Sequence, residues 1–444
     1  MKPLRIGSGA GYSGDRIPPA ADLARRGQLD WLVFECLAER TIALAQLDKQ
    51  QHPEQGYDPL LTERLRAVWP DCLAQGVRIL TNMGAAHPRA AALAALRQAQ
   101  ALGLRPRVAV LHGDDVLAPL MKQGLGLTLM DRQLPVSALA DRVVSANAYL
   151  GAEHLLPAIE TGAELIITGR VADPALFLAP LWHHFAWSAQ DWPRLGQGVV
   201  LGHLLECAAQ VSGGYYADPG VKDVPDLAHL GFPLAEVQAD GSAVLTKLEG
   251  TGGCVTVATC TEQLLYELED PACYLQPDVV ADFSQVQLRQ VGPDRVRVSG
   301  GLGQPRPDQL KVTVGYRDGF LADGQISYAG LGAVARGQLA LEVVKVRLQE
   351  AGLGHLETRY DLIGCNAILA GASPQSDPAE VRVRVSARCD TREQARAITR
   401  EVEALYLNGP AGGGGATQSV REVIAADAVL MPRDWVHTHV EVLS

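Results

Sequence analysis

The side chains best suited to chemistry follow six predicted strands in the first half of the chain. In an open parallel sheet, ligands bind beyond the carboxyl ends of the strands, so the residues just after each strand are the first candidates. In chain order they are Ser13, Asp15 and Arg16, then Glu35, Asn82, Asp114, Asn147 and Arg170. The pattern predicts a ligand cleft in which Asp15 and Asp114 transfer protons and the other residues bind substrate, with Arg170 holding a carboxylate or phosphate. Helix caps and turns also place polar residues at such junctions, which is the alternative for any one of them.

The loop after the first predicted strand is rich in glycine, with the sequence Gly7-Ser8-Gly9-Ala10-Gly11-Tyr12-Ser13-Gly14. Backbone N–H groups at Gly9 and Gly11 could approach an anion closely, so we expect both to bind substrate; a tight turn without ligand is the alternative. The spacing is not that of a dinucleotide-binding loop. Although Glu35 lies about 24 residues beyond Gly11, near the usual position of a ribose-binding carboxylate, we infer no NAD site.

Two further glycine clusters lie in the second half, Glu249–Gly253 and Asn408–Gly415, the latter before a helix expected to begin near Thr417. Glycines beside a helix start could hold a phosphate, and we expect Gly252 and Gly413 to do so. A mobile linker is the alternative.

A polar stripe is predicted on the helix that contains His203, Glu206, Cys207 and Gln210, because these residues recur at helical spacing. Imidazole and carboxylate one turn apart could act as a general acid–base pair, or as half of a metal site. An ion pair on a solvated face is the structural alternative. We predict catalysis by His203 and Glu206 and no metal site; nothing identifies a base that would activate Cys207 as a nucleophile.

Strands alternate with helices through residues 1–220, which predicts a doubly wound, mostly parallel α/β sheet with helices on both faces. The expected strands are 4–8, 29–35, 77–82, 107–112, 143–147 and 165–169, with helices such as 88–102 and 152–161 between them. Residues 221–444 are expected to form an α+β domain packed over the cleft. Its expected strands include 295–299, 310–315, 356–365 and 380–387, and its expected helices are 335–351 and 391–407.

Composition limits the classes of protein. The 444 residues are 47% hydrophobic and 20% charged, with a net charge of −11, which is typical of a globular protein and argues against nucleic acid or an acidic membrane as partner. Eight cysteines without a Cys-x-x-Cys motif favour neither a disulfide framework nor a zinc ribbon. We see no signal peptide and no membrane-spanning run, and expect a cytoplasmic homo-oligomer.

Several motifs together resemble the acyclic terpene utilisation (AtuA) family. They are Gly7–Arg16, Thr168–Asp173, Gly202–Cys207, Glu249–Gly253 and the C-terminal Pro410–Gly415. The resemblance covers nearly all of residues 1–345. One departure is His183-His184-Phe185, where relatives tend to have His-Glu-Phe.

The resemblance implies a role beside biotin-dependent carboxylases in branched acyl-CoA breakdown, as in geraniol and citronellol catabolism, but no catalytic residues. We predict a hydratase or lyase acting on a coenzyme A thioester in this setting. The alternative is a non-catalytic acyl-CoA-binding or scaffold subunit. Many relatives carry an extra small domain or have it as a separate chain, so a small partner subunit is a further expectation.

Overall fold

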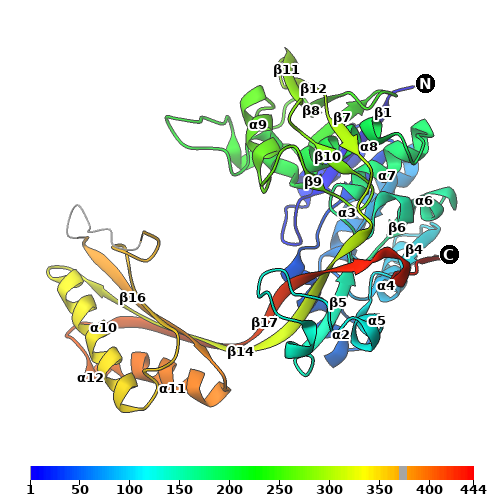
Figure 1. Ribbon diagram of the computed structural model, residues 1–444. Helices are drawn as coiled ribbons and strands as arrows, with labels where there is room; N and C mark the ends of the chain where they lie inside the picture. Colours follow the sequence, from blue (N-terminus) through cyan, green and yellow to red (C-terminus); the bar gives the residue numbers. More distant parts are fainter. Residues whose placement is uncertain (1, 370–377) are drawn as a thin grey trace. The chain divides into compact units, whose positions relative to one another are not determined.

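The computed structural model describes residues 2–369 and 378–444 (Figure 1). The chain divides into two compact units: unit 1, Met1–Gly315 with Ala426–Ser444, and unit 2, Tyr316–Ala425. This division differs from the boundary expected at residue 220. The reason is that the first strands after Gly220 extend the sheet of the N-terminal half instead of starting a separate one. The packing of a second domain over a cleft stays a prediction.

Unit 1 is built on a ten-stranded sheet with a parallel centre and antiparallel edges. The central strands, in sheet order, are β1 (Leu4–Ala10), β2 (Trp31–Phe34), β3 (Arg78–Thr81), β6 (Leu165–Ile167) and β4 (Val108–His112). Beyond β1 lie β7 (Pro233–Val237), β8 (Ala243–Lys247), β12 (Arg295–Ser299) and β11 (Gln287–Gly292), and beyond β4 lies β18 (His439–Leu443). The central strands are continuous apolar runs because both of their faces are covered.

Helices cover both faces of this sheet, so the doubly wound prediction is confirmed. One layer consists of α1 (Pro18–Arg26), α3 (Leu61–Gln75) and α4 (Pro88–Ala101), whose apolar residues share a core with Leu32, Phe34 and Ile79. The other consists of α6 (Ala152–Glu160), α7 (Ala175–Phe185) and α8 (Trp192–Glu206). The two helix layers follow from the right-handed crossover rule. The chain runs across the sheet in one direction from β1 to β4 and then in the opposite direction to β6 and β7, so the helices of the two runs lie on opposite faces. The winding reverses between β3 and β6, which is where a ligand crevice is expected.

The fifth expected strand forms, but not in this sheet. β5 (Val143–Ala148) pairs with β14 (Gln309–Ala329), whose residues up to Gly315 belong to unit 1. The local pattern of β5 predicts an extended segment, whereas the choice of partner depends on residues far away in the sequence.

Unit 1 also contains three further helices and a small sheet. They are α2 (Glu39–Gln51), α5 (Leu117–Gln123), α9 (Val257–Leu265) and a small sheet of β9 (Tyr274–Leu275), β10 (Val280–Asp282) and β13 (Leu302–Gln304). All eight cysteines of the chain are free thiols. Among the helices of the described residues, none is both long and apolar enough to cross a bilayer.

Unit 2 has the β-α-β-β-α-β order of ferredoxin-like folds. It consists of β14 from Tyr316 on, α10 (Ala333–Glu350), β15 (Thr358–Ile363), β16 (Glu380–Cys389), α11 (Arg392–Glu403), the short α12 (Leu405–Asn408) and β17 (Gly414–Pro432) up to Ala425. The sheet order is β15-β16-β14-β17, and α10 and α11 pack on one face, against Val381, Val383 and Val385 (Figure 1). The α+β prediction is therefore confirmed.

The helix expected near Thr417 is wrong, because the glycine run leads directly into strand β17. β-branched Val420, Val423 and Ile424 in this segment favour an extended backbone. The glycines themselves signal only a turn, which can precede a strand as readily as a helix.

Gly11 should be intolerant of a side chain. A Cβ at Gly11 would lie 2.6 Å from the backbone carbon of Cys207, whereas a Cβ at Gly14 would meet only the side chain of Tyr12. We expect Gly11→Ala to lower the free energy of unfolding by about 1–3 kcal/mol, measured by urea denaturation, because two backbones must separate. Gly14→Ala is the matched control in the same loop, and equal stability of the two variants would contradict the argument.

Candidate active site

Five of the predicted site residues form one buried group, here called the strand-end cluster: Glu35, Asn82, Asp114, Asn147 and Arg170. Asn82 Nδ2 donates to Glu35 Oε1 at 2.9 Å, and Asn147 Nδ2 donates to Asp114 Oδ2 at 2.9 Å. The backbone N–H of Arg170 donates to the same Asp114 oxygen at 2.8 Å. Residues that follow β2, β3, β4 and β6 are thus brought together with Asn147, near the end of β5, and all five are at most 7% exposed.

The Arg170 guanidinium lies at the centre of this cluster and is 1% exposed. Its Nη2 pairs with Asp173 Oδ1 at 2.6 Å, and its Nη1 donates to the carbonyl of Leu37. Its Cζ lies 4.1 Å from the ring centroid of Tyr149, whose hydroxyl in turn donates to Glu39. The Nε donor is buried without a partner. A buried cation is stable only when it is paired, and this one is surrounded by carboxylates.

The carboxylates around Arg170 outnumber it, and this changes their pKa values. Burial raises the pKa of Asp114 from 3.8 to about 6, although the Arg170 N–H and Asn147 oppose the shift. Burial and the nearby Glu206 raise the pKa of Asp173 to about 7 despite its pairing with Arg170. Burial alone would also raise the pKa of Glu39, but Arg170 and the Tyr149 hydroxyl lower it to about 2.

His203 and Glu206 form a buried pair on α8. Glu206 Oε1 lies 2.9 Å from His203 Nδ1, and the histidine is 1% exposed. Burial would lower the pKa of His203, but the charge and hydrogen bond of Glu206 raise it above its usual value. His203 Nε2 and Glu206 Oε2 are both buried without a partner. The helix is buried on every side, so the alternative of a solvated face does not hold for these two residues.

This pair joins the strand-end cluster to an adjacent pocket. Glu206 interacts electrostatically with Arg170 and Asp173. Glu267, in the pocket wall, interacts electrostatically with both Glu206 and Asp173. Gln263, also in the wall, donates from Nε2 to the carbonyl of His203 at 2.8 Å. One continuous set of charged groups therefore runs from Asp114 to the pocket.

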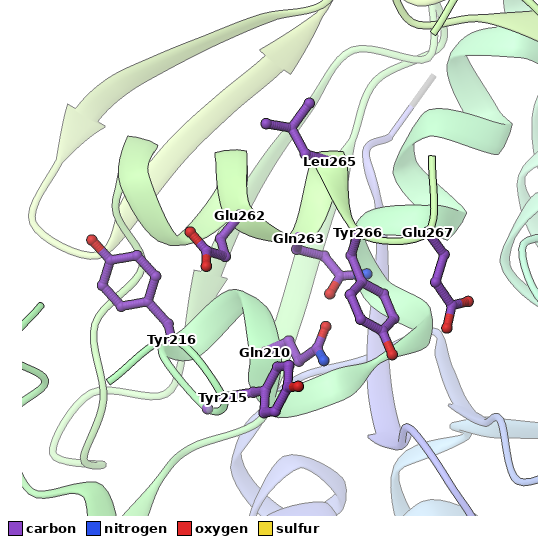
Figure 2. A pocket seen from close by; sticks show the side chains of 9 residues that line it. Gln210, Tyr215, Tyr216, Glu262, Gln263, Leu265, Tyr266 and Glu267 are labelled. Atoms are coloured by element: carbon purple, nitrogen blue, oxygen red, sulfur yellow. The ribbon is translucent and has the colours of Figure 1, made fainter. Parts of the chain in front are cut away.

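The pocket has a volume of about 440 Å³ and is lined mainly by tyrosine, glutamine and glutamate side chains. In Figure 2 the side chains of Gln210, Gln263 and Tyr266 point toward one another, and Tyr215 and Glu267 flank them. Tyr215 and Glu267 have left-handed backbone conformations, with φ of 61° and 55°. Such strain in non-glycine residues is frequent at functional sites.

The first glycine loop is held by a residue that the sequence analysis missed, Arg64 of α3. It is fully buried, its Nη2 donates to the carbonyls of Tyr12, Ser13 and Asp15, and its Nη1 pairs with Asp58 at 3.4 Å. A signal for it exists in the sequence, since Arg64 occupies a position of the helix face formed by Leu61, Leu65 and Val68.

The remaining predicted residues lie in places with their own structural reasons. Asp15 Oδ2 accepts from the N–H of Gly11 at 2.9 Å, so an internal carboxylate occupies this donor, and burial raises the Asp15 pKa. Arg16 is exposed and donates to the carbonyl of Ala228. A Cβ at Gly9 would meet the Phe34 ring at 2.6 Å, and one at Gly252 would meet the Asp226 carbonyl at 2.0 Å. Gly413 lies in unit 2, beside Ile326 and Tyr328. Binding roles for these residues stay predictions.

Within residues 2–369 and 378–444, no group of three or more His, Cys, Asp or Glu side chains is arranged so that it could hold a metal ion. Cys207 is a poor nucleophile here, because burial and Glu206 raise the pKa of its thiol.

The sequence matches the family model of the acyclic terpene utilisation family protein AtuA over residues 4–442, nearly the whole chain. The chain belongs to the AtuA family. Membership implies a role in acyclic terpene utilisation. Among curated proteins and among solved structures, none matches the chain.

Three of the motifs that carry the AtuA resemblance meet at the candidate active site. Gly11 of the first motif touches the backbone of Cys207 in the third, and Arg170 of the second interacts with Glu206 of the third. The motifs that resemble those of the AtuA family are therefore spatial neighbours, although about 190 residues separate the first from the third.

Arg170→Lys should lower the stability of the protein. An ammonium group on a flexible chain keeps the charge but cannot pair with Asp173, reach Leu37 and stack on Tyr149 together. We expect the free energy of unfolding to fall by roughly 2–4 kcal/mol in urea denaturation. Arg16→Lys, at an exposed arginine with a single carbonyl partner, is the control and should change stability by less than about 0.5 kcal/mol. A stable Arg170→Lys protein would show that the guanidinium geometry is not required.

The raised carboxyl pKa values predict a pH dependence of stability. Between about pH 4 and pH 7 the folded state keeps protons on Asp114 and Asp173 that the unfolded state has released, so stability from these groups decreases as pH rises. Asp114→Asn retains an acceptor for Asn147 and Arg170 but has no proton to lose. We expect its unfolding free energy to fall less than that of the wild type between pH 5 and 7, by roughly 1 kcal/mol. Asp282→Asn, on the small sheet, should follow the wild-type curve; identical curves for all three proteins would refute the assignment.

Proposed function

We propose that the protein is a cytoplasmic enzyme of branched-chain or terpenoid acyl-CoA catabolism, a hydratase or lyase that acts on a coenzyme A thioester. The observation that carries this proposal is the buried His203–Glu206 pair, with its two unpartnered polar atoms, beside the Arg170 cluster. Family membership supports the metabolic setting.

The proposed step is reversible hydration of a branched enoyl thioester. His203 takes a proton from water as the water oxygen bonds to the β-carbon, and the α-carbon then receives a proton. In the reverse direction, protonated His203 gives its proton to the leaving hydroxyl while the α-proton is removed. Glu206 favours the charged imidazolium that forms in between, as a hydrogen-bonded carboxylate does in other acid–base sites.

The neighbouring carboxyls suit the second proton transfer. Asp173, with its pKa raised to about 7, holds a proton near neutral pH and can also release it, which is the property required of an acid–base group. Asp114 is more deeply buried and positions the backbone of Arg170. In this proposal Arg170 compensates the negative charge that develops in the thioester enolate.

The pocket beside the pair suits the acyl part of the substrate better than its phosphates. Tyr215, Tyr216, Leu265 and Tyr266 offer apolar surface, whereas Glu262 and Glu267 would repel an anionic head group. The phosphates are therefore assigned to other groups of unit 1, for which Gly9 and Gly252 remain the predicted ones.

The second candidate is a non-catalytic acyl-CoA-binding or scaffold subunit. One observation favours it: the rings of Tyr274 and Phe283 lie edge-on to His203, each with its centroid 5.5 Å away, and cover the imidazole. Catalysis thus requires that β9 and β10 move to admit substrate, whereas a scaffold has no such need.

The test is turnover of methyl-branched enoyl-CoA and 3-hydroxyacyl-CoA thioesters, followed by mass spectrometry for gain or loss of water. We expect His203→Gln to reduce turnover about 10²–10⁴-fold, because glutamine can hydrogen-bond but cannot carry the proton. The dissociation constant of the thioester should change by less than about threefold. His184→Gln, at an exposed histidine of the same unit, is the matched control.

Each outcome separates the two candidates. Equal turnover by His203→Gln and wild type would contradict the catalytic assignment. Binding without turnover by the wild type, also after addition of a small partner subunit, would favour the scaffold. Circular dichroism of the variant shows whether a loss reflects chemistry or unfolding.

A further inference from the structure

A second pocket, of about 320 Å³, lies entirely within unit 2, between α11 and the edge strand β17. Helix α11 contributes Arg396, Thr399, Arg400 and Glu403 to its wall, and β17 contributes Gln418 and Ser419. Its volume is within the range of small-ligand sites, about 300–1,000 Å³.

Two guanidinium groups in this wall have no partner. Arg396 and Arg400 are exposed, and within residues 2–369 and 378–444 the structure shows neither a hydrogen bond nor an ion pair for either side chain. Glu403 could pair with Arg400 one turn away, yet it accepts from Gln418 Nε2 at 3.2 Å instead. Two other arginines of unit 2 have partners: Arg384 pairs with Asp361 at 2.6 Å, and Arg382 donates to Gln325, Ser327 and Thr417.

The proximity of Arg396 and Arg400 destabilises the helix, and the described residues show no contact that compensates for it. Like charges at positions i and i+4 of a helix destabilise it, and the side chains face each other across one turn. Both arginines lie beside a hollow, not on a convex surface, so an anion there would meet both guanidinium groups together.

We propose that this pocket binds a phosphate group of a small molecule. A phosphate monoester carries nearly two negative charges at neutral pH, which matches two guanidinium groups, and the planar N–H pairs of arginine fit phosphate oxygens bidentately. The Ser419 hydroxyl at the pocket wall adds a further donor. Glu403 opposes the anion and limits affinity. The proposal does not depend on the activity proposed for unit 1.

The test is isothermal titration calorimetry on the full chain with three probes: inorganic pyrophosphate, adenosine 3′,5′-bisphosphate and coenzyme A. We expect binding that weakens as sodium chloride is raised, because exposed charges are screened. The double variant Arg396→Gln/Arg400→Gln should weaken binding at least tenfold while the melting temperature stays equal or rises slightly, because the repulsion between the two charges is removed. Glu403→Gln should strengthen binding severalfold, since it removes the opposing charge.

Arg392→Gln is the matched control, because Arg392 is on the same helix but lies over the Phe320 ring and outside the pocket. It should leave the dissociation constant within about twofold. Tighter binding of the adenosine compound or coenzyme A than of pyrophosphate would identify a nucleotide as the ligand, and equal binding would identify the phosphate alone. Absence of binding by all three probes, or binding unaffected by the double variant, would overturn the proposal.

Discussion

The burial of one arginine is the constraint on which the centre of unit 1 depends. An unpaired guanidinium in the interior would cost several kcal/mol, so Arg170 needs partners around its charge. Asp173 and the Leu37 carbonyl accept hydrogen bonds from it, and the Tyr149 ring stacks on it. These three residues follow β6, β2 and β5, respectively. These contacts fix the positions of the loops after β2, β5 and β6 relative to one another. Asp114 in addition accepts a hydrogen bond from the Arg170 backbone and holds it in place.

An excess of carboxyl groups around a single arginine gives the site its chemical character. Burial shifts the pKa of Asp114 and Asp173 into the range from about 6 to about 7, where a proton is held and released near physiological pH. The same excess lowers stability as the pH rises, so the arrangement costs folding free energy. Strongly shifted pKa values are frequent at functional sites, which is why we propose that the chemistry takes place here and at the adjoining His203–Glu206 pair.

The arginines discussed in the two units differ in burial and in the number of their partners. In unit 1, Arg170 and Arg64 are buried and surrounded by acceptors, and they fix loop geometry. In unit 2, Arg396 and Arg400 remain exposed beside a hollow. A buried guanidinium with bonded Nη groups can act on a ligand mainly through its charge, whereas an exposed pair also has all of its donors available. Positioning in one unit and recognition in the other follow from that difference.

The sequence by itself determined the local structure and the composition of the site. Apolar runs predicted all six N-terminal strands, and the residues at or just beyond their ends include the five of the strand-end cluster. His203 and Glu206 were identified by helical spacing. Only the tertiary structure decided which strands pair, that β5 leaves the parallel sheet and that the unit boundary falls at Gly315. It also revealed Glu39 and Arg64 as partners. Pairing, burial and the resulting pKa shifts depend on contacts between residues far apart in the chain, and periodicity carries no information about those contacts.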